Sequence, residues 1–203
     1  MWALVQDGAV TKTFNYGKGF VLNGNQYSAD IFMKWSKAEK EAIGIYEVIV
    51  DKSNYKDPAY YNNTNSTIAF ANGQVTESWG TATPKRLNDE NAVDQDGNPV
   101  LQDGIQIINY GLKTEKKIIV KDQAAGLLAK TDWYVVKATE VADYTVPANI
   151  TTYRAAVRAK SNEMETAIDN AANVDALKAL YEYTDDGNGN ITRPLGEWPE
   201  EVI

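Results

Sequence analysis

The sequence predicts an α+β chain, and two changes of pattern along the 203 residues support this prediction. Residues 1–82 alternate between short apolar segments and turn dipeptides, which is typical of small β-hairpins. Residues 111–183 instead carry apolar residues at helical spacing. A turn-rich connector at 83–110 lies between the two patterns, and a short tail follows at 184–203. We therefore expect a β-rich N-terminal module with one short helix and a helical C-terminal module.

Strands and hairpins account for most of the N-terminal module. Asp7-Gly8 lies between apolar segments at 2–6 and 9–14, and this arrangement is a strong hairpin signal. A second turn is expected at Asn23-Gly24-Asn25. Residues 67–71 and 74–76, joined by Asn72-Gly73, predict another hairpin.

One helix interrupts these strands. Ser36-Lys37-Ala38-Glu39 has the spacing of a capping box, in which the Ser and Glu side chains satisfy free backbone N–H groups. Gly44 lies where a helix end can adopt a left-handed conformation. Residues 45–50 then alternate as a strand.

Helices dominate the second half. Residues 113–130 predict a long helix, although 118–120 also fit a strand, and 132–136 are expected to leave that helix in extended form. Pro147 is placed to open the next helix, because its missing N–H costs nothing in the first turn. The apolar positions of that helix are Tyr153, Ala156, Val157, Met164, Ala167 and Ile168. Asn173 or Asp175 is expected to start a shorter helix.

Composition excludes several classes of function. The chain contains no His and no Cys, so thiolate nucleophiles, Ser-His-Asp triads and ordinary zinc sites are ruled out. We expect no catalytic residue, no cofactor and no metal. The turn at 185–190 resembles a calcium loop only superficially, because Thr184 and Leu195 occupy the positions where an acidic residue and a bidentate Glu are required. Acid–base chemistry would fall to carboxylates, Lys or Tyr.

Charge and hydropathy restrict the partners and the location. A net charge of −8 disfavours binding to nucleic acid or to anionic membrane surfaces. No apolar stretch approaches the ~20 residues that a membrane span requires, and no signal peptide is evident at the N-terminus. We expect a soluble protein made in a cytoplasm.

Two arginines suggest a contact surface in the helical half. Arg154 and Arg158 lie four residues apart, on one face of the expected helix, with Tyr153 beside them. Asp132 and Glu140 are candidate acidic partners within the chain. One interpretation is a packed helical pair with two surface salt bridges, and the other is a docking face on which Arg and aromatic residues meet another subunit.

These same residues resemble a known family. Leu127-Leu128, Thr131 to Val136 with its Asp-Trp pair, Val146-Pro147, Tyr153-Arg154 and Val157-Arg158 are similar to the C-terminal part of tail fibre assembly proteins of tailed bacteriophages. Residues 1–10 also resemble the openings of related phage tail proteins, and residues 36–48 resemble a segment of such proteins that precedes a strand. Residues 51–112 and the chain after 170 have no counterpart in this resemblance.

The resemblance implies a non-enzymatic protein that binds tail fibre or baseplate subunits in the host cytoplasm during assembly. It leaves open whether the protein stays in the virion tail and whether it forms a homo-oligomer. The candidate interface residues are Trp133, Tyr153, Arg154 and Arg158. The alternative is a glycan-binding domain that uses Trp35, Trp79 or the run 55–61, or a glycan-cleaving domain with two carboxylates across a groove.

Overall fold

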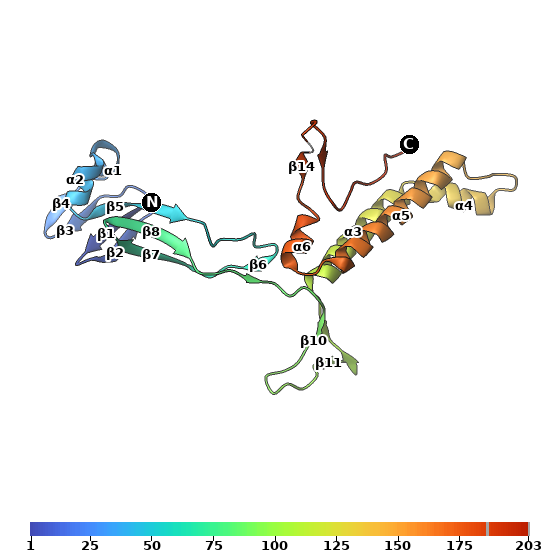
Figure 1. The fold of residues 1–203 in the computed structure, drawn as a ribbon, viewed down its shortest axis with the longest axis horizontal. Coiled ribbons are helices and arrows are strands. Elements are labelled where there is room, and N and C mark those ends of the chain that lie inside the picture. The colour runs from blue at the N-terminus through green and yellow to red at the C-terminus, as the bar shows by residue number, and fades with distance from the viewer. Residues whose placement is uncertain (186, 203) are drawn as a thin grey trace. The chain divides into compact units, whose positions relative to one another are not determined.

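The chain divides into two compact units, Met1–Thr83 and Pro84–Ile203. The computed structural model describes residues 1–185 and 187–202 (Figure 1). Strands predominate over helices in the first unit and helices over strands in the second, so the predicted α+β class is confirmed.

A five-stranded sheet forms the centre of the first unit. Its strand order is β2-β1-β5-β8-β7, with β5 and β8 parallel and every other neighbouring pair antiparallel. The strands are β1 (Trp2–Gln6), β2 (Ala9–Phe14), β5 (Ile45–Asp51), β7 (Ser66–Ala71) and β8 (Gln74–Trp79). Both predicted hairpins, β1–β2 and β7–β8, are therefore confirmed, as is the strand predicted at 45–50.

Side chains from both faces of this sheet are buried. Leu4 and Ile45 pack with Phe14 on one face, in a cluster completed by Phe20, Ile31 and Phe32. On the other face Ala3 packs against Val48 and Val75. Adjacent residues of a strand point to opposite faces, so Ala3 and Leu4 contribute to different clusters.

Small elements cover one face of the sheet or extend from it. They are β3 (Phe20–Leu22), β4 (Asn25–Tyr27), α1 (Ile31–Lys34), α2 (Lys37–Ala42), β6 (Tyr61–Asn62) and β9 (Thr83–Pro84). The predicted capping box of α2 is present: the Ser36 hydroxyl accepts from the Glu39 N–H at 3.3 Å, and the Glu39 carboxylate accepts from the Ser36 N–H at 2.7 Å. The predicted turn at 23–25 joins β3 to β4.

A pair of long helices forms the centre of the second unit. Helices α3 (Leu112–Ala129) and α5 (Ala148–Asn170) lie side by side (Figure 1). Tyr153 and Val157 of α5 pack on Ala124 of α3. The helices predicted at 113–130 and after Pro147 are confirmed, and 118–120 are helical. The short helix α6 (Val174–Ala179) starts at Asn173, whose side chain accepts from the Ala176 N–H at 2.8 Å.

The prediction that 132–136 are extended is wrong. These residues begin helix α4 (Asp132–Glu140). The aromatic and β-branched side chains at 133–136 favour a strand locally, but contacts made by the preceding residue override that preference. The Tyr134 N–H donates to the Thr131 carbonyl at 3.2 Å, and the Thr131 side chain is itself held in place by α5.

The predicted connector contains short strands. They are β10 (Glu90–Asn91), β11 (Leu101–Gln102), β12 (Ile105–Gln106) and β13 (Ile108–Asn109), paired as β10–β13 and β11–β12. Asp89 anchors this segment to the start of α3, because its carboxylate accepts from the Gly111 N–H at 2.8 Å and from the Thr114 hydroxyl at 2.9 Å. A residue distant in sequence thereby caps α3.

The predicted tail packs against the helices. Strands β14 (Thr184–Asp185) and β15 (Ile191–Thr192) form the hairpin expected around 185–190, of which Asp186 lies outside the described residues. Leu195 is buried, and its N–H donates to the Leu180 carbonyl at 2.9 Å.

Candidate functional site

Helix α4 presents its larger apolar side chains to solvent. None of its nine residues is buried. Tyr134 and Ala138, one turn apart, are partly buried, and the buried Thr131 precedes them on the same face. Trp133 and Val136 lie on the opposite side and are 52% and 50% exposed. Helix α4 therefore exposes large apolar side chains among its polar ones, a feature found on surfaces that bind a partner.

Arg154 of α5 fixes the start of this helix. Its Nη1 donates to the Leu128 carbonyl at 2.8 Å and to the Thr131 hydroxyl at 2.7 Å, and it pairs with the Asp132 carboxylate at 2.8 Å. The Leu128 carbonyl is one of the last of α3, and it also accepts from the Thr131 N–H at 3.0 Å and from the Thr131 hydroxyl at 2.9 Å. A cation at this end also interacts favourably with the helix dipole. One guanidinium thus joins α3, α4 and α5.

The four predicted interface residues separate into two groups. Trp133 and Arg158 are exposed. Tyr153 and Arg154 are buried, at 5% and 8% exposure. Burial raises the pKa of Tyr153, with the Glu201 carboxylate adding to the effect. Of the two acidic candidates, Asp132 is the one that pairs with Arg154.

Trp198 completes the packing between α3 and α5, a role that the sequence did not predict. It packs on the cluster that contains Tyr153 and Val157. Its indole N–H donates to the Gln123 side chain at 3.1 Å, and Glu201 pairs with Lys130. The Trp198-Pro199 pair, flanked by Glu residues, is the sequence feature that could have indicated a buried contact near the C-terminal end of the sequence.

Most aromatic residues considered for glycan binding have structural contacts. The Trp35 ring meets Tyr27 edge-on at 6.0 Å, and the Trp79 ring meets Tyr55 at 5.3 Å. In the run 55–61, Tyr60 and Tyr61 are buried. Trp35 and Trp79 are partly buried and contribute to packing in the first unit, whereas Tyr55 is 40% exposed.

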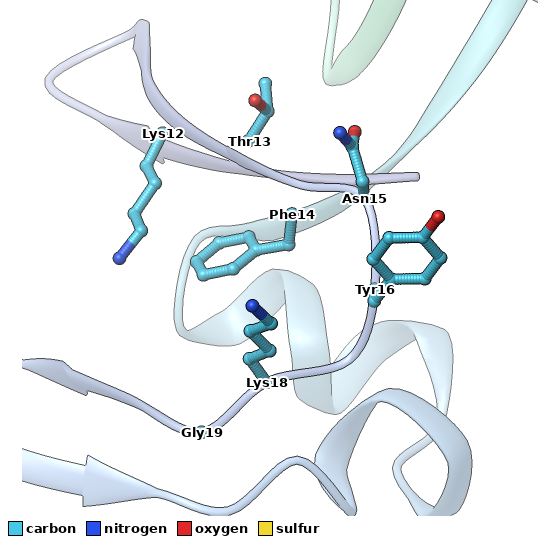
Figure 2. Close-up of a pocket in the computed structure, with 7 residues that line it drawn as sticks. All are labelled: Lys12, Thr13, Phe14, Asn15, Tyr16, Lys18 and Gly19. Carbon is cyan, nitrogen blue, oxygen red and sulfur yellow. The ribbon is translucent and has the colours of Figure 1, made fainter.

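A cationic hollow of about 400 Å³ lies between β2 and β3. Figure 2 shows the ring of Phe14 between the side chains of Lys12 and Lys18, with Tyr16 beside them. The Lys12 ammonium lies 5.1 Å from the centre of the Phe14 ring, and Tyr16 is 77% exposed. The lining contains no carboxylate, so the hollow is suited to a polar or anionic ligand.

A second hollow, of about 300 Å³, contains two carboxylates. Glu41 comes from α2 and Glu47 from β5. Lys37 pairs with Glu41 at 3.6 Å. Both carboxylates line one surface depression, and glycan cleavage would require them to face each other at about 5–9.5 Å across the bound sugar.

Neither a protein-family model, nor a curated protein, nor a solved structure matches this chain. Within residues 1–185 and 187–202, no helix is long and apolar enough to cross a membrane. The same residues contain no cluster of three or more Asp or Glu side chains arranged to hold a metal ion.

Proposed function

We propose that this chain is a non-enzymatic protein that binds tail fibre or baseplate subunits of a tailed bacteriophage during assembly. The observation that carries the proposal is helix α4, whose Trp133 and Val136 face solvent while none of its residues is buried. The segment on which the family resemblance rests, 127–158, spans the end of α3, the whole of α4 and the first half of α5. The resemblance and the exposed apolar face therefore coincide.

The chemistry of α4 defines the partner surface. Lys137 lies one turn from Trp133, with its ammonium 5.9 Å from the indole ring centre and 4.4 Å from that of Tyr144. A matching surface is an apolar pocket that receives Trp133, with a carboxylate near Lys137. The exposed half of a Trp offers on the order of 100 Å² of apolar surface, which is worth about 2.5 kcal/mol on burial.

A double substitution tests this surface. Trp133→Ser with Val136→Ser is expected to weaken binding to the fibre or baseplate subunit by at least tenfold, since about 1.4 kcal/mol corresponds to that factor. Binding would be measured by biolayer interferometry with subunits encoded by the same phage. Val21→Ser with Met33→Ser removes two exposed apolar side chains from the first unit and should leave the affinity unchanged. Equal losses in both variants, or no bound subunit at all, would refute the proposal.

Quantitative mass spectrometry of purified phage particles and of infected-cell lysate tests whether the protein is retained in the particle. A transient assembly role in the host cytoplasm predicts the protein in the lysate and its absence from the particle. Recovery in the particle at a fixed ratio to tail proteins would instead make it a component of the virion tail. Self-association is tested separately by sedimentation of the purified chain.

The alternative proposal is a glycan-binding or glycan-cleaving domain in the first unit. The exposed Tyr16 beside Lys12 and Lys18 favours binding, and the hollow with Glu41 and Glu47 favours cleavage. A glycan array tests binding, and chromogenic glycosides test cleavage. Cleavage by the wild type that is lost in both Glu41→Gln and Glu47→Gln would establish the enzyme and overturn the non-enzymatic proposal.

A further inference from the structure

Residues 86–110 form a small structure, here called the acidic arm, whose interior is polar. Three backbone hydrogen bonds link its segments: Ala92 N–H to the Ile107 carbonyl at 2.8 Å, Val100 N–H to the Ala92 carbonyl at 2.9 Å, and Ile107 N–H to the Val100 carbonyl at 2.9 Å. The Gln106 side-chain amide lies within 2.8–3.2 Å of the same three carbonyls. Its two N–H hydrogens are shared among these three carbonyls, so the Gln106 side chain holds the segments that contain Ala92, Val100 and Ile107 together.

The apolar side chains of the acidic arm point outward. Ala92 is the only buried residue among 86–110, all of which the structure describes. Five large side chains are each about half exposed or more: Val93 58%, Leu101 56%, Ile105 72%, Ile108 48% and Tyr110 56%. A segment of this size would bury such residues if they served its own stability. Their exposure around a polar centre indicates a contact surface.

The charge of the acidic arm is of one sign over most of its length. Residues 87–112 contain no Lys and no Arg but five carboxylates. Asp89 is engaged in capping α3, and Glu90 pairs with Arg86 at 3.0 Å. Asp94 accepts from the N–H groups of Asp96 and Asn98 at 2.9 and 2.8 Å within its own turn. The exposed carboxylates of Asp96 and Asp103 remain at the turns, near the exposed apolar residues in sequence.

We propose that the acidic arm docks into a partner protein whose apolar surface is bordered by Lys or Arg. Complementary charge next to an apolar contact steers association and selects partners. A second copy of this chain is disfavoured, because it carries a net charge of −8 and presents the same carboxylates. Nucleic acid and anionic membranes are repelled for the same reason. This surface is separate from α4, so the chain has two faces of different chemistry and can join two partners.

Two peptides serve as probes for this chemistry. One is an 18-residue amphipathic helix with a Leu stripe bordered by Lys, and the other replaces every Lys with Glu. Isothermal titration calorimetry with the full chain is expected to show binding of the Leu/Lys peptide at low salt and none of the Leu/Glu peptide. Leu101→Ser with Ile105→Ser should weaken binding at least tenfold. So should Asp96→Asn with Asp103→Asn, in which Asn keeps the positive φ of residue 103 accessible.

A charge-matched control separates the acidic arm from the general acidity of the chain. Asp122→Asn with Glu200→Gln removes two exposed carboxylates outside the arm and should leave the affinity within twofold. Hydrogen exchange at 92–107 should slow when the Leu/Lys peptide is bound. The proposal is overturned if the control pair weakens binding as much as the arm pair, if the serine variant binds normally, or if the peptide protects other segments instead.

Discussion

Replacement of Arg154 by Met tests how α3, α4 and α5 are held together where they meet. Methionine keeps most of the aliphatic volume of the arginine stem, so the change removes the guanidinium and little packing. The variant loses the bonds from Nη1 to the Leu128 carbonyl and to the Thr131 hydroxyl, and the ion pair with Asp132. Each lost contact joins α5 to the junction between α3 and α4.

The expected loss can be worked out contact by contact. Hydrogen bonds to a charged group contribute about 1.5 kcal/mol or more each, and two are removed. The Leu128 carbonyl keeps the Thr131 N–H at 3.0 Å and the Thr131 hydroxyl at 2.9 Å as donors, so its loss is partial. The Asp132 side chain is 58% exposed, and water and salt screen its ion pair to about 0.5 kcal/mol. We therefore expect Arg154→Met to lower the free energy of unfolding of the helical unit by about 2–3 kcal/mol.

Urea unfolding followed by circular dichroism at 222 nm measures this change, because the long helices belong to the second unit. Arg158→Met is the matched control. Arg158 lies one turn further along α5, is exposed, and makes one long contact of 3.4 Å to the Arg154 carbonyl. It should change stability by less than about 0.5 kcal/mol. Similar values for the two variants would refute the assignment of Arg154 as the junction of the three helices.

Two further substitutions test local features. The Gly111 N–H holds the pKa of Asp89 below its usual value, so the stabilisation from this carboxylate is present above pH 3.8 and lost as the pH falls through the folded-state pKa. Asp89→Asn should remove that part of the pH dependence in acid unfolding curves, and an unchanged curve would contradict the capping role. Gly44 has φ +80°, and an added Cβ would lie 2.5 Å from the Val5 carbonyl oxygen. Gly44→Ala should therefore destabilise the first unit by about 3 kcal/mol in thermal unfolding, against about 1 kcal/mol for Gly8→Ala, where φ is +78° but no atom is near.

The sequence predicted elements whose signals are local. The dipeptide Asp7-Gly8 specifies its hairpin, because both residues adopt positive φ there. Ser36 and Glu39 specify the start of α2 through contacts only three residues apart. Each signal is contained within a few neighbouring residues, and tertiary packing does not reverse it.

The sequence did not predict elements that depend on distant contacts. Residues 133–136 favour a strand by composition, whereas the helix there depends on Arg154, more than twenty residues away. The burial of Arg154 and the exposure of Arg158 cannot be distinguished from their spacing alone, because the difference depends on where α3 ends in space. Asp89 likewise caps α3 from a segment with no helical signal of its own.

Helix α4 has a thermodynamic consequence for any partner that it meets. Nine residues are fewer than the roughly 12–15 that an isolated helix needs to be even marginally stable in water. Its attachment to the rest of the unit depends on one guanidinium and two partly buried side chains, Tyr134 and Ala138. The helix should therefore open and close locally while α3 and α5 stay folded, and its amide hydrogens should exchange sooner than theirs. Part of the free energy of association with a partner would then be consumed in holding α4 closed, which weakens the complex.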